Sequence, residues 1–445
     1  MRKQKILVGT SEICGVLATF ADGFRRLGHP VTSVIRTRDL YDDPEIEYDV
    51  DLNSATIEWP ERICHSRSLW VRLPRGVINR LALGARMRRL LSHDVFLFQH
   101  ARSLCGGNSD YPLLKKRRKR IVSVFNGGDI RHPSAYDQQY AHIEGPGFSL
   151  EKLMAQDDRH RDLILEVHVP PLERPLRNLR MGELYADLIL SVPNQSGLAV
   201  RPYMHFLVPV NLSNFKCTIP GRDIPVIVHA PSFKSVKGSK AILAALERIR
   251  SEGVPFELRL LDGVPNPQVL AELRNADMAI DQLHFNLHGS FTLEAMASGC
   301  AVATCNREDC EPVPPKRPIC HIDESTLYDR LKVLLSDREL RVRLAHDGRR
   351  HVEKYHDHVK VAGRIMQCLD HGIDRYDHYP TFFARDYRLP DGETIPEDLK
   401  RMTAQIVQCW GLPQDVDPED MIARGLMKRE ALTPCVPIPR WPAKS

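Results

Sequence analysis

The chain has 445 residues, of which 42% are hydrophobic and 27% are charged, and its formal net charge at pH 7 is +5. This composition is typical of a soluble globular protein, and the length exceeds what one hydrophobic core supports, so we expect two domains and an additional segment. No run of 18 uncharged apolar residues occurs, which excludes a transmembrane helix. We expect no signal peptide, because the first residues lead directly into a predicted strand.

The cysteines favour reduced thiols in a cytoplasmic protein. All 11 are scattered without paired spacing. Cys300, Cys305, Cys310 and Cys320 lie close together in sequence, but their spacings match no zinc motif, and the first two flank a predicted buried strand. We therefore expect no metal site.

The chain begins with a predicted strand–helix–strand unit. A strand over residues 5–9 leads into a helix with apolar residues on one face, and a second strand covers residues 31–35. The first turn holds a single glycine, Gly15, and lacks the G-x-G-x-x-G spacing, so nothing here indicates NAD or FAD. Gly15 either lets the backbone approach a ligand or permits close packing of helix against strand.

Two basic segments follow this unit. Eight arginines and no acidic residue lie between Arg62 and His93, and six basic residues run from Lys115 to Arg120. The first segment favours an amphipathic helix from about Pro74, which either rests on an anionic membrane surface or is an ordinary helix with its arginines in water. Nucleic acid fits less well, because no recognition motif accompanies the arginines.

Polar residues follow two further predicted strands, at 94–98 and 121–125. The second is followed by a glycine loop that carries Asn126, Asp129 and Arg131. Polar groups at the carboxyl ends of parallel strands are typical of a binding cleft, although an aspartate beside glycines can also cap its own turn.

Residues 134–177 lack clear periodicity and are expected to be irregular. A helix–strand pattern then returns at 181–190, and we place a domain boundary near residue 215.

The stretch from His229 to Thr304 reads as alternating strands and helices, which is half of a doubly wound α/β domain. Ser239 is a predicted helix cap, and Asn266 begins another helix ahead of a proline. Lys237 is expected in a loop, and Gly289 and Ser290 open a third helix. A lysine beside a helix N-terminus can receive a phosphate or a diphosphate.

Glu294, one turn into that third helix, can accept hydrogen bonds from a ribose diol. The alternatives are a solvated Lys237 and a Glu294 that only complements the helix dipole. Asp281 and Gln282 end a strand that faces the same cleft, where they either assist binding or cap the following loop. Further on we expect a charged helix over 338–358, a helix over 361–369 that closes the domain, and a helix over 396–409.

The pattern HAPS at His229, the Lys-Gly pair at Lys237 and EAMASG at Glu294 resembles the donor domain of family 4 (group 1) glycosyltransferases, over roughly residues 1 to 370. The resemblance implies an α/β GT-B fold, with two Rossmann-like domains around an interdomain cleft. It places an acceptor-side domain at 1–215, a donor domain at 216–370 and an extension at 371–445. A helix of the extension would pack back on the first domain or mediate dimer contact.

The resemblance implies a hexosyltransferase of glycan biosynthesis that retains anomeric configuration and needs no metal. The donor would be a nucleotide diphosphate sugar, with UDP favoured over GDP, and the acceptor a hydroxyl group on a glycan, a lipid-linked sugar or a small molecule. No cofactor is implied. The expected location is cytoplasmic, with contact to the inner face of the membrane left open.

The resemblance also assigns residues. It implies roles at the donor for Gly15, Lys237, His288, Gly289, Ser290, Phe291 and Glu294, and at the reaction centre for Asn126, Asp129, Arg131 and Asn286. The chain departs from the family at three positions. It has Asn126 where many members carry histidine, Ser232 where arginine is common, and Asn286 where the first glutamate of a Glu-x7-Glu pair is usual. These departures keep a second interpretation open, a non-catalytic nucleotide-sugar-binding or scaffold subunit. A GT-B epimerase or phosphorylase is a separate alternative.

Overall fold

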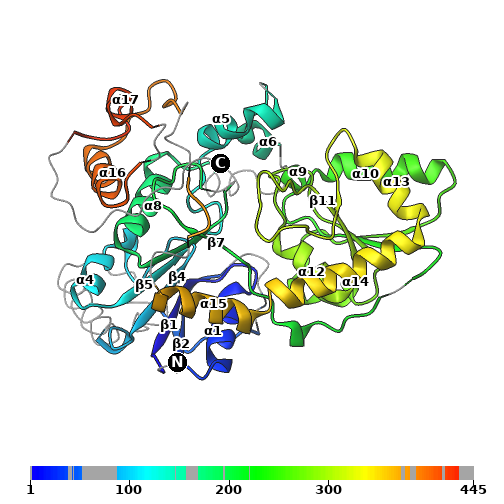
Figure 1. Cartoon of the computed structure of the whole chain (residues 1–445). Helices are drawn as coiled ribbons and strands as arrows, with labels where there is room; N and C mark the ends of the chain where they lie inside the picture. The colour runs from blue at the N-terminus through cyan, green and yellow to red at the C-terminus, as the bar shows by residue number, and fades with distance from the viewer. Residues whose placement is uncertain are drawn as a thin grey trace, which may run out of the picture.

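The computed structural model describes residues 3–38, 43, 45–52, 88–145, 147–156, 169–193, 196–219, 221–371, 376–380, 387–412 and 416–429. Within these ranges the chain forms two α/β lobes side by side, each built around its own parallel sheet (Figure 1). This arrangement confirms the predicted class of two Rossmann-like domains.

The first domain contains a seven-stranded sheet in the order β3-β2-β1-β4-β5-β6-β7, in which all neighbours are parallel. The strands are β1 (Ile6–Ser11), β2 (Val31–Thr37), β3 (Val50–Asp51), β4 (Val95–Gln99), β5 (Arg120–Val124), β6 (Leu188–Ser191) and β7 (Met204–His205). Every residue of β1 and β4 is buried, as the apolar runs predicted. The strand order reverses between β1 and β4, and such switch points are where α/β sheets bind ligands, beyond the carboxyl ends of the strands.

The helices of the first domain are α1 (Val16–Arg26), the short 3₁₀ helix η2 (Gly106–Asn108), α4 (Tyr111–Lys116), α5 (Pro133–Glu144), α6 (Leu150–Met154) and α8 (Glu173–Tyr185). The expectation of an irregular segment at 134–177 is therefore wrong for the described part, which includes α5 and α6. The apolar periodicity of α5 is weak because this helix packs both against α6 and against the second domain. Tyr136 and Tyr140 of α5 pack in a cluster with Leu150 of α6 and with Phe285 of the second domain.

The second domain holds a five-stranded parallel sheet in the order β12-β11-β10-β8-β9. Its strands are β8 (Val226–His229), β9 (Glu257–Leu260), β10 (Met278–Ile280), β11 (Ala301–Thr304) and β12 (Cys320–His321). Its helices are α9 (Lys234–Lys237), α10 (Ser239–Ser251), α11 (Asn266–Leu273), α12 (Ser290–Ser298), α13 (Leu327–Ser336) and α14 (Arg338–Tyr355). The switch point of this sheet lies between β8 and β10.

Two predictions of local structure in this domain are wrong. Ser239 does not cap α10. The residue before it, Gly238, takes the cap position with φ at 68°, and the Ser239 hydroxyl instead hydrogen-bonds Nε2 of the buried His229 at 2.9 Å. Lys237 does not lie in a loop but ends the short helix α9. The first difference follows from the buried His229 on β8, which binds the Ser239 hydroxyl at the start of α10.

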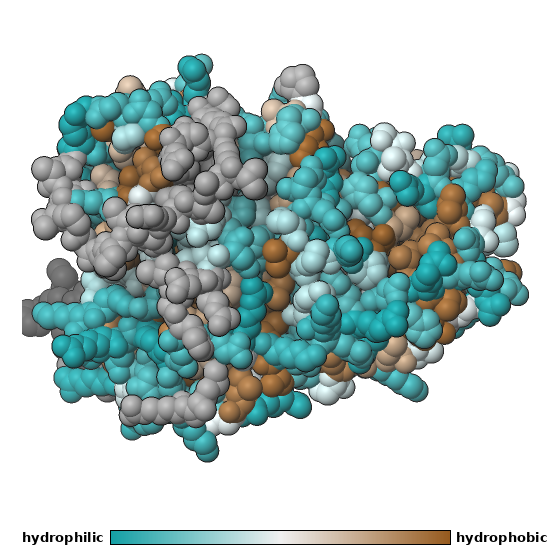
Figure 2. All heavy atoms as spheres, in the orientation of Figure 1, coloured by the Kyte–Doolittle hydropathy of each residue, from teal (hydrophilic) through white to brown (hydrophobic). Residues whose placement is uncertain are grey.

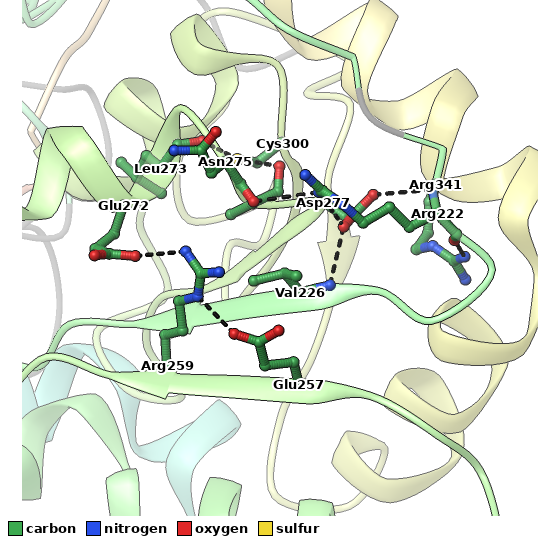
Figure 3. A network of polar contacts seen from close by, with 11 residues as sticks. Arg222, Val226, Glu257, Arg259, Glu272, Leu273, Asn275, Asp277, Cys300 and Arg341 are labelled. Carbon is green, nitrogen blue, oxygen red and sulfur yellow. Dashed lines mark hydrogen bonds and ion pairs between the residues drawn. The ribbon is translucent and has the colours of Figure 1, made fainter.

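The amino edge of the second sheet is closed by a polar network (Figure 3). Asp277 is buried there and accepts hydrogen bonds from Arg222 Nη1 at 2.8 Å and from the backbone N–H of Val226 at 2.9 Å. Arg341 of α14 donates to the backbone oxygen of Arg222 at 2.8 Å. Asp277 therefore has partners within this network, and the opposite, carboxyl edge of the sheet is where a doubly wound fold places a ligand.

The helix α15 (His358–His371) does not close the second domain, as the sequence predicted, but crosses to the first. It packs on α1, where Val361, Ala362 and Ile365 share a core with Leu17 and Phe20 (Figure 1). Further along the chain, α16 (Glu397–Trp410) lies on α8, where Arg180 Nε donates to Thr403 Oγ1 at 2.8 Å, and α17 (Pro418–Ala423) follows. An amphipathic pattern predicts that a helix buries one face but does not specify which domain receives it.

A close helix contact at this crossing gives a test of the fold. A Cβ atom on Gly23 of α1 would lie 2.6 Å from the carbonyl oxygen of His358 and 3.2 Å from the Cβ of Ala362. We expect Gly23→Ala to lower the free energy of unfolding by about 1–3 kcal/mol, since the helices must move apart. Gly363→Ala, on α15 with nothing within 4 Å of the new Cβ, is the matched control and should be neutral or stabilising. Urea titrations that showed equal effects of both substitutions would contradict the packing.

No helix in the described part of the chain is long and apolar enough to cross a membrane. The predicted basic helix from Pro74 lies outside the described residues, apart from a short end at 88–93 where Arg88 and Arg89 are exposed. In the second basic segment, Lys115 pairs with Asp187 at 2.6 Å and Arg120 with Asp370 at 2.9 Å. The face seen in Figure 2 is mostly hydrophilic, with hydrophobic atoms in separate groups over both domains.

Candidate functional site

Two adjoining cavities lie between the domains, at the carboxyl ends of β1 and β8. One has a volume of about 200 Å³ and the other about 550 Å³. Cys14 from the first domain and Asn266, Ser290 and Glu294 from the second line both. Each cavity lies beside the switch point of a parallel sheet, which is where a doubly wound fold places its ligand.

Lys237 lines the smaller cavity and is already paired with a carboxylate. Its ammonium donates to Asp281 Oδ1, and to Gln282 Oε1 at 3.1 Å, while the side chain of Asp281 is fully buried and that of Lys237 is 13% exposed. Thr292 Oγ1 donates to the second carboxylate oxygen of Asp281 at 2.7 Å. The pair fixes the ammonium at the cavity wall, and the remaining N–H direction can reach a ligand.

The N-terminus of α12 faces the same cavity. Ser290 and Phe291 line it, and no side chain in the described residues caps the first turn at Gly289. A Cβ on Gly289 would lie 3.3 Å from Asp281 Oδ2 and 3.8 Å from Lys237 Nζ, so glycine keeps this position open beside the lysine. Uncapped amides and a lysine at one cavity wall form a receptor for a phosphate group.

Glu294 lies one turn further along α12 and lines both cavities. Its Oε1 accepts a hydrogen bond from Asn266 Nδ2 at 3.0 Å. Burial raises the pKa of Glu294 to about 7, and the hydrogen bond from Asn266 opposes this increase. The carboxyl group is therefore poised to change protonation near neutral pH, and once ionised it can accept two hydrogen bonds from a diol.

The first turn of the N-terminal domain is closed to a phosphate. The buried Glu12 carboxylate accepts hydrogen bonds from the N–H groups of Ile13, Leu17 and Ala18 at 2.8–3.0 Å, so it occupies the N-terminus of α1. Gly15 follows with φ at 71°, lines the larger cavity and has nothing within 4 Å of an added Cβ atom. Glycine is needed here for its backbone conformation, and close packing of helix on strand is not the reason.

The residues expected at the reaction centre lie elsewhere, in a junction between the domains. Asn286 is buried with φ at 52°, and its Nδ2 donates to Glu144 Oε1 of α5 at 2.7 Å. The Arg131 guanidinium stacks on the ring of Phe285 at 4.4 Å, and burial lowers the pKa of Arg131 to about 10. Both contacts hold the first domain against the loop that follows β10, and neither Asn286 nor Arg131 lines the two cavities.

Asp129 and Asn126 are joined in one turn. Asp129 Oδ1 accepts from the N–H groups of Asn126 at 3.1 Å and Gly127 at 2.7 Å, so it caps its own loop. The Oδ1 atom of Asn126 is buried and has no hydrogen-bond partner among the described residues. The His288 ring lies 5.7 Å from that of His356, and burial lowers the pKa of His288 well below the usual range.

The structure thus gathers Gly15, Lys237, Gly289, Ser290, Phe291 and Glu294 around the cleft and places Asn126, Asp129, Arg131, Asn286 and His288 outside it. Two further residues contact these groups, because Glu144 hydrogen-bonds Asn286 and Asn266 hydrogen-bonds Glu294. The sequence marked Asn266 as the start of a helix, which is correct, but nothing local indicated that its side chain meets Glu294. Among the described residues, no group of three potential ligands that suits a metal ion occurs.

The sequence matches no protein-family model and no curated protein. Solved structures do share the fold. Sucrose-phosphate synthase from Thermosynechococcus elongatus is 15% identical with a TM-score of 0.50, and the match covers 82% of this chain and 98% of that one. Anabaena HepE, solved in complex with UDP-glucose, is 11% identical with a TM-score of 0.44 over 82% and 99% of the two chains. The starch synthase IV catalytic domain from Arabidopsis thaliana, bound to ADP and acarbose, is 11% identical with a TM-score of 0.47 over 83% and 99%. The similarity to sucrose-phosphate synthase, with its TM-score of 0.50, establishes the fold alone, which is the predicted GT-B fold.

Proposed function

We propose that this chain is a glycosyltransferase that moves a sugar from a nucleotide diphosphate sugar to a hydroxyl acceptor, with retention of configuration and without a metal. One observation carries the proposal. The cleft between the two sheets brings Lys237, the uncapped N-terminus of α12 and Glu294 to one continuous space. Lys237 and the N-terminus of α12 match the diphosphate of one ligand, and Glu294, one turn further along α12, matches its ribose.

The chemistry assigned to the cleft is charge stabilisation. As the bond between the anomeric carbon and the phosphate oxygen breaks, negative charge grows on the departing diphosphate. Lys237 and the amides of Ser290 and Phe291 stabilise that charge. The acceptor hydroxyl forms the new bond to the anomeric carbon, and its proton passes to a phosphate oxygen of the leaving group. No protein nucleophile is required, so Asn126 and Asn286 are compatible with activity.

The alternative of a binding subunit without activity has its own support. The positive charge of Lys237 is balanced by Asp281, and Asn286 hydrogen-bonds Glu144 in place of a ligand. The two functions differ in one measurement. The protein is incubated with UDP-, GDP- and dTDP-sugars, and nucleotide binding is recorded first, followed by nucleotide release with a panel of hydroxyl acceptors.

We expect binding of UDP-sugars ahead of GDP-sugars, release that depends on acceptor, unchanged rates in EDTA, and a product with the anomeric configuration of the donor. Binding without release across a broad acceptor panel would identify a non-catalytic subunit. Interconversion of the donor sugar without an acceptor would identify an epimerase. Absence of nucleotide binding would remove the proposal altogether.

Contact with an anionic membrane stays a prediction, which rests on the basic segment between Arg62 and His93. Arg88 and Arg89 are its exposed residues in the described part of the chain. We expect the double substitution to alanine to weaken sedimentation with vesicles that contain phosphatidylserine, because each arginine near such a surface contributes about 1 kcal/mol. Unchanged sedimentation would argue for an ordinary solvated helix.

A further inference from the structure

The short helix α9, which ends at Lys237, packs against the first domain. Leu150 and Met154 of α6 are buried in one apolar cluster with Val236 of α9, and the two helices are in direct contact (Figure 1). A helix of one turn has little stability of its own, because so few of its backbone groups are paired within it. The position of α9 therefore depends on what packs against it.

The helix α9 has the cluster on one side and the donor cavity on the other. Phe233, which precedes the helix, and Lys237, which ends it, line the smaller cavity, whereas Val236 lies in the cluster. Phe233 also packs against the cluster, so this side chain contacts both regions. A shift of α6 relative to the second domain would therefore move the cavity wall that carries the ammonium group.

The same cluster supports the residues that bind the Lys237 ammonium. Phe285 and Leu287, in the loop after β10, pack against it, and the Phe285 ring lies 5.7 Å from that of Tyr136 in an edge-on arrangement. In the same loop, Gln282 accepts a hydrogen bond from Lys237 Nζ at 3.1 Å and donates from Nε2 to the Leu287 oxygen at 2.7 Å. One amide group thus links the ammonium to the part of the loop that meets the first domain.

The conformation of this loop is held by contacts from the first domain. Phe285 has φ at 76° and Asn286 has φ at 52°, a region that residues with side chains adopt where their surroundings hold them there. The surroundings here are the Arg131 guanidinium, 4.4 Å from the centre of the Phe285 ring, and Glu144, which accepts from Asn286 Nδ2 at 2.7 Å. Both come from outside the second domain.

The far side of α9 is closed by the second domain itself. The Leu283 N–H donates to the Lys237 oxygen at 3.3 Å. A Cβ atom on Gly238, where φ is 68°, would lie 2.7 Å from Leu283 Cδ1, so the chain leaves the helix in close contact with this side chain. Lys237 therefore lies between Leu283 of its own domain and α6 of the first domain.

We propose that α6 is a positioning element of the donor site, and that Met154 fixes the place of the Lys237 ammonium by packing against α9. Met154 lines neither cavity of the cleft, so it acts through α9 and not on the ligand. The second domain supplies the groups that bind the diphosphate, and the first domain fixes one of them. The effect on catalysis rests on the proposed function, whereas the support of α9 by α6 does not.

The first experiment measures the support of α9 without a nucleotide. Amide hydrogen exchange of the full chain is followed by mass spectrometry in the native protein, Met154→Ala, Met154→Leu and Met421→Ala. We expect Met154→Ala to speed exchange in peptides that cover α9 and residues 282–287 at least tenfold, because these segments open locally once their support is removed. Met154→Leu, which nearly conserves volume, should change this exchange less than twofold.

The matched control is Met421→Ala. Met421 is a buried methionine on the short helix α17, in a cluster built by the first domain and the C-terminal segment, and its truncation should leave exchange in α9 unchanged. Val236→Ala truncates the same contact from the side of α9 and should reproduce the effect of Met154→Ala, so the test does not depend on one variant. Exchange in α9 that is native in both variants, or that is equally fast in Met421→Ala, overturns the proposal.

The second experiment tests the link to Lys237. Affinity for UDP and the kinetics of transfer are measured for the native protein, Met154→Ala and Met154→Leu. We expect Met154→Ala to weaken UDP binding about tenfold and to lower kcat while the KM of the acceptor stays unchanged, and Met154→Leu to restore native values. A merely structural residue would lower the amount of active protein and leave the affinity of the folded fraction unchanged.

The same substitution is then made in a protein without the ion pair, Lys237→Met with Asp281→Asn. There Met154→Ala should change the affinity for UDP less than twofold, because the group that it positions is absent. An equal tenfold effect in both backgrounds overturns the positioning of Lys237. Faster exchange in α9 together with a native protein that binds no UDP would retain the support of α9 and remove the proposed function, so the two failures are distinguishable.

Discussion

Substitution of Lys237 by methionine is expected to lower the rate of sugar transfer by about 100- to 1,000-fold, the effect of removing one group that stabilises developing negative charge. Lys237 is the cation of the smaller cavity, and Asp281 and Gln282 fix its position. Methionine keeps most of the side-chain volume and removes the charge. The measurement is nucleotide release with saturating donor and acceptor, together with the affinity for UDP.

A loss of activity alone would not separate function from folding. Removing Lys237 leaves the fully buried Asp281 carboxylate without its cation, which costs about 3–5 kcal/mol of stability in comparable buried pairs. The double variant Lys237→Met with Asp281→Asn removes both charges and should recover much of the stability. If Lys237 only balances Asp281, the double variant regains activity. If Lys237 binds the diphosphate, the double variant is stable and remains inactive, which is the result we expect.

The matched control for charge is Lys240→Met. Lys240 is exposed on α10, three residues from Lys237, and lines neither cavity of the cleft. Its substitution should change the rate less than twofold. An equal loss in the Lys240 and Lys237 variants would point to a general effect of charge on the domain and would remove Lys237 from the site.

Substitution of Glu294 by glutamine is expected to weaken UDP binding by about 10- to 100-fold at pH 8, the size of one or two hydrogen bonds to a charged group. The expected pH dependence follows from the raised pKa. Below about pH 7 the native carboxyl group is protonated, and above it the group is ionised and accepts hydrogen bonds from both ribose hydroxyls. The affinity of the native protein should therefore increase about tenfold between pH 6 and pH 8.

The glutamine variant should lack this increase, because an amide does not titrate. UDP has a phosphate group that titrates near pH 6, so the relevant quantity is the difference between the native and variant profiles. Glu247→Gln, on the exposed face of α10, is the control and should follow the native profile. Parallel profiles for native protein and Glu294→Gln would show that the carboxyl group does not contact the ribose.

The sequence by itself determined the parts of this protein that depend on local pattern. The strands predicted at 5–9 and 94–98 correspond to the observed buried strands at 6–11 and 95–99, because a strand covered on both faces carries no polar alternation. The small residues at Gly289 and Ser290 and the carboxyl group of Glu294 one turn later lie along one predicted helix, and together with the Lys-Gly pair at Lys237 they predicted a phosphate receptor. The structure places these residues on one cleft.

The tertiary structure alone decided the rest, and the physical reason is distance along the chain. Lys237 meets Asp281 across 44 residues and Asn286 meets Glu144 across 142, so no local pattern specifies these partners. Burial raises the pKa of Glu294 only once the chain is folded. In the same way, Arg36, Arg102 and Arg174 line one cavity in the first domain only when strands from separate segments align. The helix α15 shows the same limit, because its apolar face predicted burial, and only the folded chain showed that α1 of the first domain receives it.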